Sequence, residues 1–318
     1  MVRWEEMGTL GVIDTLTAAF NTVTKRLGLV IIPVFLDLFL WLGPKLSIAP
    51  VIERTVNLFR LAMESVPTSV SPDANPADMF EMMLDTLQNT VGQTNLLALL
   101  AWGRLGVPSV AGMRPIGSDA DWVIEIAEYG QMFLLQLLIL AVGLLIACIF
   151  LGMLAQTAGG EGLSLAKLSR RIGTYWLYMA AIFVPLSIAL IFGLSTGILL
   201  GAFGIFIGAM ILWMMLYVSF VPHAITLGQE KPLRALWSSF SVVRFNFWPA
   251  LGLILLTNVI NTGLGLVWHR LLMNSAIGTL VAIVANAYVG TALTLALFIF
   301  YRDHVRDRSQ SLGQQRSV

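Results

Sequence analysis

The stretch that decides the fold is QMFLLQLLILAVGLLIACIFLGML, residues Gln131–Leu154. It carries no charged side chain and exceeds the roughly 20 apolar residues that an α-helix needs to cross a bilayer. Five other stretches have a similar length and apolar character: Leu27–Leu46, Tyr175–Leu194, Ile198–Val221, Phe247–Val267 and Ile277–Phe300. The sequence therefore predicts an all-α, polytopic membrane protein with six transmembrane helices plus amphipathic in-plane helices.

The composition of the chain agrees with this class. Hydrophobic residues make up 57% and charged residues 12% of the 318 positions, whereas soluble domains carry about 25% charged residues. A formal net charge of +1 argues against a nucleic-acid partner, which would need a basic excess. No phosphate-binding loop, nucleophile elbow or zinc-protease motif occurs in the sequence, so we predict no enzyme, no cofactor and no metal site.

Basic residues indicate the orientation of the spans, because Lys and Arg concentrate in cytoplasmic loops. They gather before the first span, after the second, after the fourth and after the sixth: Arg3, Lys25, Arg26, Lys167, Arg170, Arg171, Lys231, Arg234, Arg244, Arg302, Arg306, Arg308 and Arg316. The link between spans five and six has only Arg270. Both termini are therefore predicted to be cytoplasmic.

This topology divides the chain into five parts. They are a cytoplasmic amphipathic segment (1–26), the first span (27–48), an extracytoplasmic region of amphipathic helices (49–125), a five-span bundle (126–301) and a cytoplasmic tail (302–318). The extracytoplasmic region holds nine acidic residues and four arginines. Its nearly apolar stretch Asn95–Ala111 is too interrupted for a seventh span, since Gly103, Arg104 and Pro108 break it. We expect it to be re-entrant or interfacial, forming an outer lid with the amphipathic helices.

An amphipathic helix is predicted over Pro232–Phe247, after the fourth span. Trp237 and Phe240 lie on its apolar face, and Arg234 and Arg244 lie opposite or on the flanks. Such a helix lies in the headgroup plane of a membrane, with its basic side toward anionic lipid.

Three short motifs carry a resemblance to a known family. They are Phe220-Val221-Pro222, then Leu236-Trp237-Ser238-Ser239, then Asn246-Phe247-Trp248 at the start of an apolar run. Over Gln131–Tyr301 the chain resembles the membrane domain attached to some bacterial glycerophosphodiester phosphodiesterases, and related six-helix membrane proteins. The resemblance implies a bacterial plasma-membrane protein. The soluble hydrolase barrel of those enzymes has no counterpart here, so no catalytic residues carry over.

Asp37 is the only charged side chain deep inside a span, and a charge there is costly. Asn258, Asn261 and Asn286 fall at comparable depths in spans five and six. These four residues form a predicted intramembrane polar cluster. One interpretation is a protonated carboxyl group hydrogen-bonded to the asparagines, and the other is a carboxylate that couples proton or cation movement.

Small residues recur at four-residue spacing in two spans, as Gly204 and Gly208 and as Ala282, Asn286 and Gly290. This spacing lets helices approach closely, and we interpret it as helix packing within the chain, with self-association as the alternative.

The sequence is compatible with three classes of function. The favoured interpretation is a non-enzymatic scaffold or accessory subunit of a larger membrane complex, whose partners are the lipid bilayer and other membrane protein subunits. The alternative is a transporter or permease subunit with Asp37 in a midplane polar site. A lipid enzyme embedded in the membrane is the third hypothesis, with only scattered polar candidates.

Overall fold

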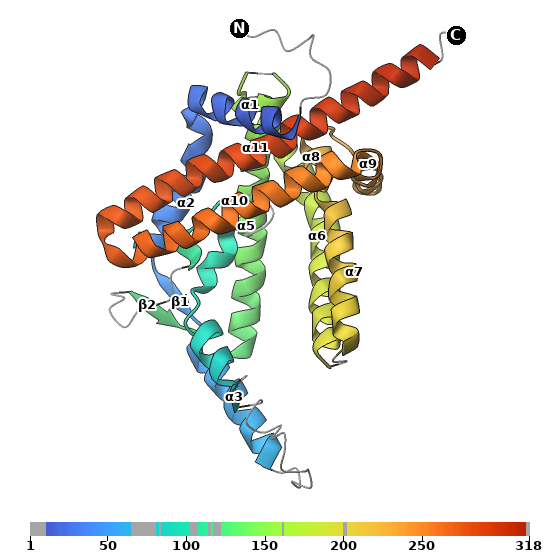
Figure 1. Ribbon diagram of the computed structural model, residues 1–318. Helices are drawn as coiled ribbons and strands as arrows, with labels where there is room; N and C mark the ends of the chain where they lie inside the picture. Colours follow the sequence, from blue (N-terminus) through green and yellow to red (C-terminus); the bar gives the residue numbers. More distant parts are fainter. Residues whose placement is uncertain are drawn as a thin grey trace.

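The computed structural model shows an almost wholly helical chain (Figure 1). It describes residues 11–64, 81–82, 84–101, 107–113, 116, 122–160, 162–199 and 202–315. In that part of the chain, five helices are long and apolar enough to cross a membrane, which makes this a membrane protein by length and composition. They are Tyr129–Ala158, Leu165–Leu190, Phe206–Thr226, Phe247–Met273 and Ala276–Val305.

The predicted first span is shorter than expected. It consists of a 3-10 turn, η2 (Leu27–Val30), followed by α2 (Ile31–Leu42). Gly43 adopts an extended conformation and ends the helix, and the Lys45 ammonium donates to the carbonyl oxygens of Leu40 and Trp41. At the rises of the two helix types, η2 and α2 together measure about 26 Å. The predicted first span is therefore not among the five long helices.

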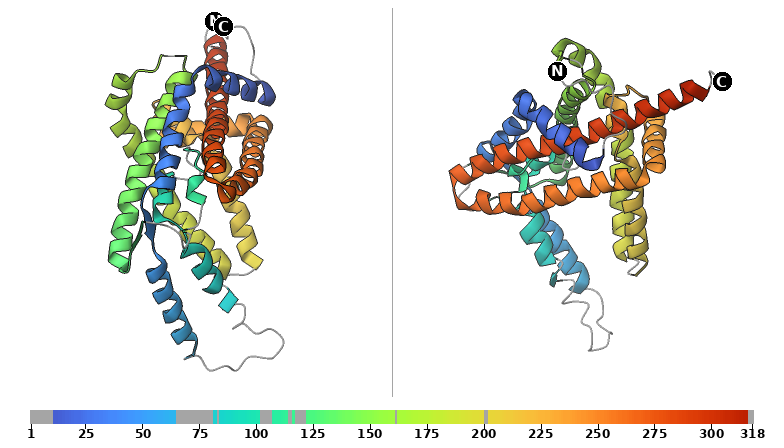
Figure 2. Two further views of the ribbon diagram at one scale, coloured as in Figure 1. Left: turned by 90° about the vertical axis from the view of Figure 1, so that its left-hand side faces the viewer. Right: turned by 45° about the horizontal axis from the view of Figure 1, so that its top comes forward.

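The long helices fall into two groups (Figure 1). The axes of the first group are all upright in Figure 1. This group comprises α5 (Tyr129–Ala158), α6 (Leu165–Leu199) and α7 (Ala202–Val218). The second is a hairpin of α10 (Phe247–Asn274) and α11 (Ala276–Gln315), which runs across the first group in Figure 1 and in the right-hand view of Figure 2. Helix α11 continues to Gln315, so the predicted tail is helical as far as the structure describes it.

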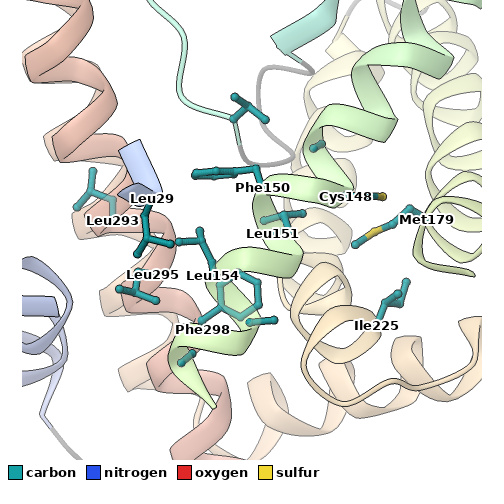
Figure 3. Packing of buried hydrophobic residues seen from close by; sticks show 14 of the residues in the cluster. Leu29, Cys148, Phe150, Leu151, Leu154, Met179, Ile225, Leu293, Leu295 and Phe298 are labelled. Atoms are coloured by element: carbon teal, nitrogen blue, oxygen red, sulfur yellow. The ribbon is translucent and has the colours of Figure 1, made fainter. Parts of the chain in front are cut away.

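The hydrophobic core is centred on the second half of α5 (Figure 3). Phe150, Leu151 and Leu154 are at most 2% exposed. Around them pack side chains from four other elements: Leu29 of η2, Met179 of α6, Ile225 of α8 (Val221–Thr226), and Leu293, Leu295 and Phe298 of α11. Cys148 is buried in the same core as a free thiol. This core joins the crossing hairpin to the upright helices.

The N-terminal helix α1 (Val12–Lys25) packs on α11. The hydroxyl groups of Thr24 and Tyr288 lie 2.8 Å apart, within hydrogen-bonding distance, and Phe20 contacts the Tyr288 ring. The predicted cytoplasmic segment is thus attached to the bundle.

The region between α2 and α5 begins with a small parallel sheet. Strand β1 (Lys45–Ser47) pairs with β2 (Val123–Glu125), so the two ends of the region lie together. From this sheet α3 (Ala49–Glu64) projects beyond the end of α5 (Figure 1), rather than covering the bundle as the predicted lid would. Helical residues 81–82 and 84–86 and the π-helix η3 (Leu87–Val91) return beside it.

The basic segments predicted to share one side of the membrane lie toward one end of the molecule. Helix α1, the start of α6, α9 (Pro232–Phe245) and the end of α11 lie toward the upper end in Figure 1. The turn between α6 and α7 and the projecting α3 lie toward the opposite end. The turn between α10 and α11, which the prediction puts on that opposite side as well, lies midway between the two ends in Figure 1. The arrangement therefore agrees with the basic loops only in part, and the topology stays a prediction.

Candidate functional site around Asp37

Asp37 lies on α2 with its side chain fully buried. Its neighbours on the helix, Leu36 and Leu40, are buried and apolar. A carboxyl group in such surroundings is tolerated only where hydrogen bonds replace those it loses from water. Its partners therefore define what this residue does.

Those partners come from three successive residues of the segment 107–113. The Ser109 hydroxyl donates to Asp37 Oδ1 at 2.5 Å. The Val110 amide lies 3.2 Å from Oδ1 and 3.0 Å from Oδ2, and the Ala111 amide donates to Oδ1 at 3.2 Å. Each contact is a donor facing a carboxylate oxygen, so the site is built for an acceptor.

This geometry is that of a helix cap supplied from a distance. Val110 and Ala111 lie at the start of a 3-10 turn, η5 (Ala111–Met113), where backbone N–H groups have no partner within the turn. Aspartate is among the preferred residues for capping such groups. Asp37 performs this role from 73 positions away in the sequence, and it fixes the segment inside the bundle.

Helix α11 holds the other side of the same segment. A Cβ atom added at Gly290 would lie only 2.2 Å from Pro108 Cβ, so Gly290 provides the space that this proline occupies. Val110 belongs to a buried cluster with Ala282, Ile283 and Leu272. The small residues of α11 therefore admit a non-helical segment at Gly290 as well as α10 at Ala282.

The segment Asn95–Ala111 thus enters the bundle where the structure describes it. Leu96, Leu97 and Leu100 of η4 (Leu96–Ala101) are buried, and η4 contacts α5. Residues 102–106, which include the predicted interruption, lie outside the described residues.

The predicted polar cluster assembles only in part. Asn286 is 6% exposed and lies one turn from both Ala282 and Gly290, on the face of α11 that meets Pro108 and Val110. Its Nδ2 is buried and has no hydrogen-bond partner.

The other two asparagines lie elsewhere. Asn258 is exposed and donates to the Ile254 carbonyl of its own helix, and Asn261 is also exposed on α10. The hydrogen bonds of Asp37 go to Ser109, Val110 and Ala111 and not to these asparagines. The cluster inferred from depth alone is therefore corrected to Asp37 and Asn286 on two sides of one segment.

The remaining predicted packing site is Gly204 and Gly208 on α7. A Cβ atom at Gly208 would meet open space, and the surroundings of Gly204 lie outside the described residues.

The membrane-surface residues of α9 are found as follows. Trp237 is 68% exposed, and Phe240 is half-buried between Trp237 and Tyr217, at ring-centroid distances of 5.8 and 4.9 Å. Arg234 and Arg244 are exposed. The face of α9 that packs inward is a different one, formed by Ala235, Ser239, Ser241, Val242 and Val243.

Among the described residues, no three His, Cys, Asp or Glu side chains gather as a metal site would require. His223 is buried against Phe298 and Phe220, at ring-centroid distances of 4.3 and 5.6 Å, and His304 Nδ1 contacts the Phe300 carbonyl.

Comparison of the chain with protein families, with curated proteins and with solved structures finds no match. The resemblance to the phosphodiesterase membrane domains therefore stays a prediction from the three sequence motifs.

Proposed function

We propose that the chain is a non-enzymatic integral membrane protein that acts as a scaffold or accessory subunit of a larger membrane complex. The observation that carries this proposal is the arm formed by α3 and residues 81–82 and 84–91. On the predicted topology the arm lies in water outside the membrane. It nevertheless exposes large apolar side chains, which mark interaction surfaces on soluble parts of proteins: Leu58, Phe59, Leu61 and Met82.

The arm is mounted on the bundle by polar contacts at its base. Arg54 donates to the Ala127 carbonyl at 2.9 Å, and the Thr55 and Tyr129 hydroxyls lie 3.0 Å apart. Farther out, Arg60 pairs with Glu81 at 3.0 Å and with Asp85 at 3.4 Å. These contacts hold the two sides of the arm together. A surface that binds a partner protein needs to be held in this way.

Site-specific cross-linking tests this function. A photoreactive amino acid at Leu58 or Leu61, activated in native membranes, should give a discrete heavier species that mass spectrometry identifies as a membrane protein partner. The matched control is the same amino acid at Met210, which is exposed on the apolar helix α7 and should cross-link to lipid. If Leu58 and Leu61 yield only the lipid adducts seen at Met210, the scaffold proposal fails.

A transporter or permease subunit is the second candidate. The observation in its favour is the unpartnered Nδ2 of Asn286 on the far side of the segment that Asp37 holds, because transporters bind substrates at irregular segments inside the membrane. Reconstituted vesicles test it. Proton- or cation-coupled flux that disappears in Asn286→Leu, in a protein that still folds, would favour transport over the scaffold.

A further inference from the structure

The outer surface of α9 combines cations with exposed aromatic rings. Lys231, Arg234 and Arg244 are all exposed, and the helix itself, Pro232–Phe245, contains no acidic residue. Glu230 precedes the helix and offsets part of the charge of Arg234. Within the described part of the chain, Lys231 and Arg244 have no carboxylate within 4.0 Å.

The rings beside these cations form a continuous cluster across three helices. From Trp237 and Phe240 of α9 it passes to Tyr217 and Trp213 of α7, and then to Phe247 and Trp248 of α10, with successive ring centroids 4.9–5.9 Å apart. Trp213, Trp237 and Trp248 are 56, 68 and 77% exposed. Exposed Trp and Tyr side chains are enriched at the headgroup level of membranes.

The inner face of α9 fixes which side points outward. Ser239 Oγ accepts from the Phe220 amide at 3.1 Å and donates to the Tyr217 carbonyl at 2.5 Å. Ala235 and Val243 are fully buried beside it. The helix cannot roll to hide its cations without breaking these contacts.

We propose that the outer surface of α9, with the aromatic cluster of α7 and α10, binds the headgroups of anionic phospholipids. Lys231 and Arg244 supply the charge that attracts the phosphates, and the exposed tryptophans occupy the boundary between headgroups and acyl chains. A zwitterionic headgroup has no net charge to match these cations. The inference rests on the membrane architecture and is independent of any protein partner.

Tryptophan quenching by brominated lipid tests the proposal on the full-length chain in detergent micelles. Brominated phosphatidylglycerol should quench the tryptophan fluorescence at a lower lipid concentration than brominated phosphatidylcholine does. The variant Lys231→Gln/Arg244→Gln should weaken apparent binding of phosphatidylglycerol by about 25-fold, at roughly fivefold per cation. The charge-matched control is Arg170→Gln/Arg171→Gln, which removes two exposed arginines of α6 and should retain most of the preference.

Two results would overturn the proposal: equal quenching by the two lipids, or an equal loss in both double variants, which would indicate a diffuse surface potential. Should the α9 variant not fold, the unaltered protein still decides the matter. Roughly 0.5 M salt must suppress a preference that depends on exposed cations, and a preference that survives such salt would refute the role of Lys231 and Arg244.

Discussion

Replacing Asp37 by Asn is the most informative perturbation of this structure. If Asp37 were the protonated carboxyl group of the first interpretation, the change would be tolerated, because Asn copies the shape of a neutral carboxyl group. In the structure every partner of Asp37 is a donor. An Asn oxygen can replace Oδ1, but its NH₂ group then faces the Val110 amide. Losing one charge-assisted hydrogen bond and opposing two donors should lower the free energy of unfolding by about 1–3 kcal/mol.

Asp37→Leu should cost more, since it leaves the Ser109 hydroxyl and two backbone amides buried without an acceptor. At about 1–3 kcal/mol for each unsatisfied donor, the loss should be at least about 3 kcal/mol. Ser109→Ala removes one donor only and should cost about 1 kcal/mol. The expected order of stability is therefore wild type, Ser109→Ala, Asp37→Asn and Asp37→Leu.

Thermal unfolding of the purified variants in lipid nanodiscs measures this order. Hydrogen exchange supplies the local readout, because the Val110 and Ala111 amides should exchange faster in both Asp37 variants. An Asp37→Asn protein that unfolds at the wild-type temperature, with unchanged exchange at Val110, would show that Asp37 does not cap this segment.

Three further predictions follow from other parts of the chain. Gly290→Ala should destabilise the protein by about 1–3 kcal/mol because the added methyl group overpacks against the inserted segment. Gly208→Ala is the control and should be close to neutral, since its methyl group would point into open space. The difference between the thermal unfolding midpoints of these two variants is the measurement. Burial raises the pKa of Glu230 above its usual value, while Arg234 and Ser238 oppose the shift, so the folded chain holds this proton more tightly and stability should fall as pH rises from the unfolded value of about 4.3 through the raised one. Glu230→Gln should flatten that part of the pH–stability curve, and an unchanged slope would contradict the assignment. Finally, a cysteine that replaces Asn57 should react with an impermeant thiol reagent on whole cells, whereas a cysteine that replaces Ser169 should not. The native Cys148 is buried and should not react. The reverse pattern of labelling would contradict the predicted topology.

Periodicity and composition predict the helical class of this protein well, because long apolar runs have few other stable conformations in a bilayer. The break at Gly43-Pro44 and the short α2 depend on a cap from Lys45 that apolar length does not encode. The crossing of α10 and α11 over the upright helices likewise depends on tertiary packing.

The site shows the same division. Asp37 is conspicuous in the sequence as a charge inside a span, but its partners are backbone amides, which leave no mark in the residue types. Depth along a helix placed Asn258 and Asn261 beside it, whereas depth says nothing about which way a side chain faces. The signal that was available is the irregular stretch Pro108–Ala111, in which the amides of Val110 and Ala111 need an acceptor.

The unequal lengths of α2 and α5 have a consequence for the surrounding lipid. The two helices run side by side in Figures 1 and 2, yet the 30 residues of α5 measure about 45 Å, against about 26 Å for η2 and α2. On a six-span architecture, a bilayer of uniform thickness cannot match both. The membrane should thin locally on the α2 side, and the energy of that deformation would draw this protein toward thinner bilayers and toward neighbours that share the mismatch.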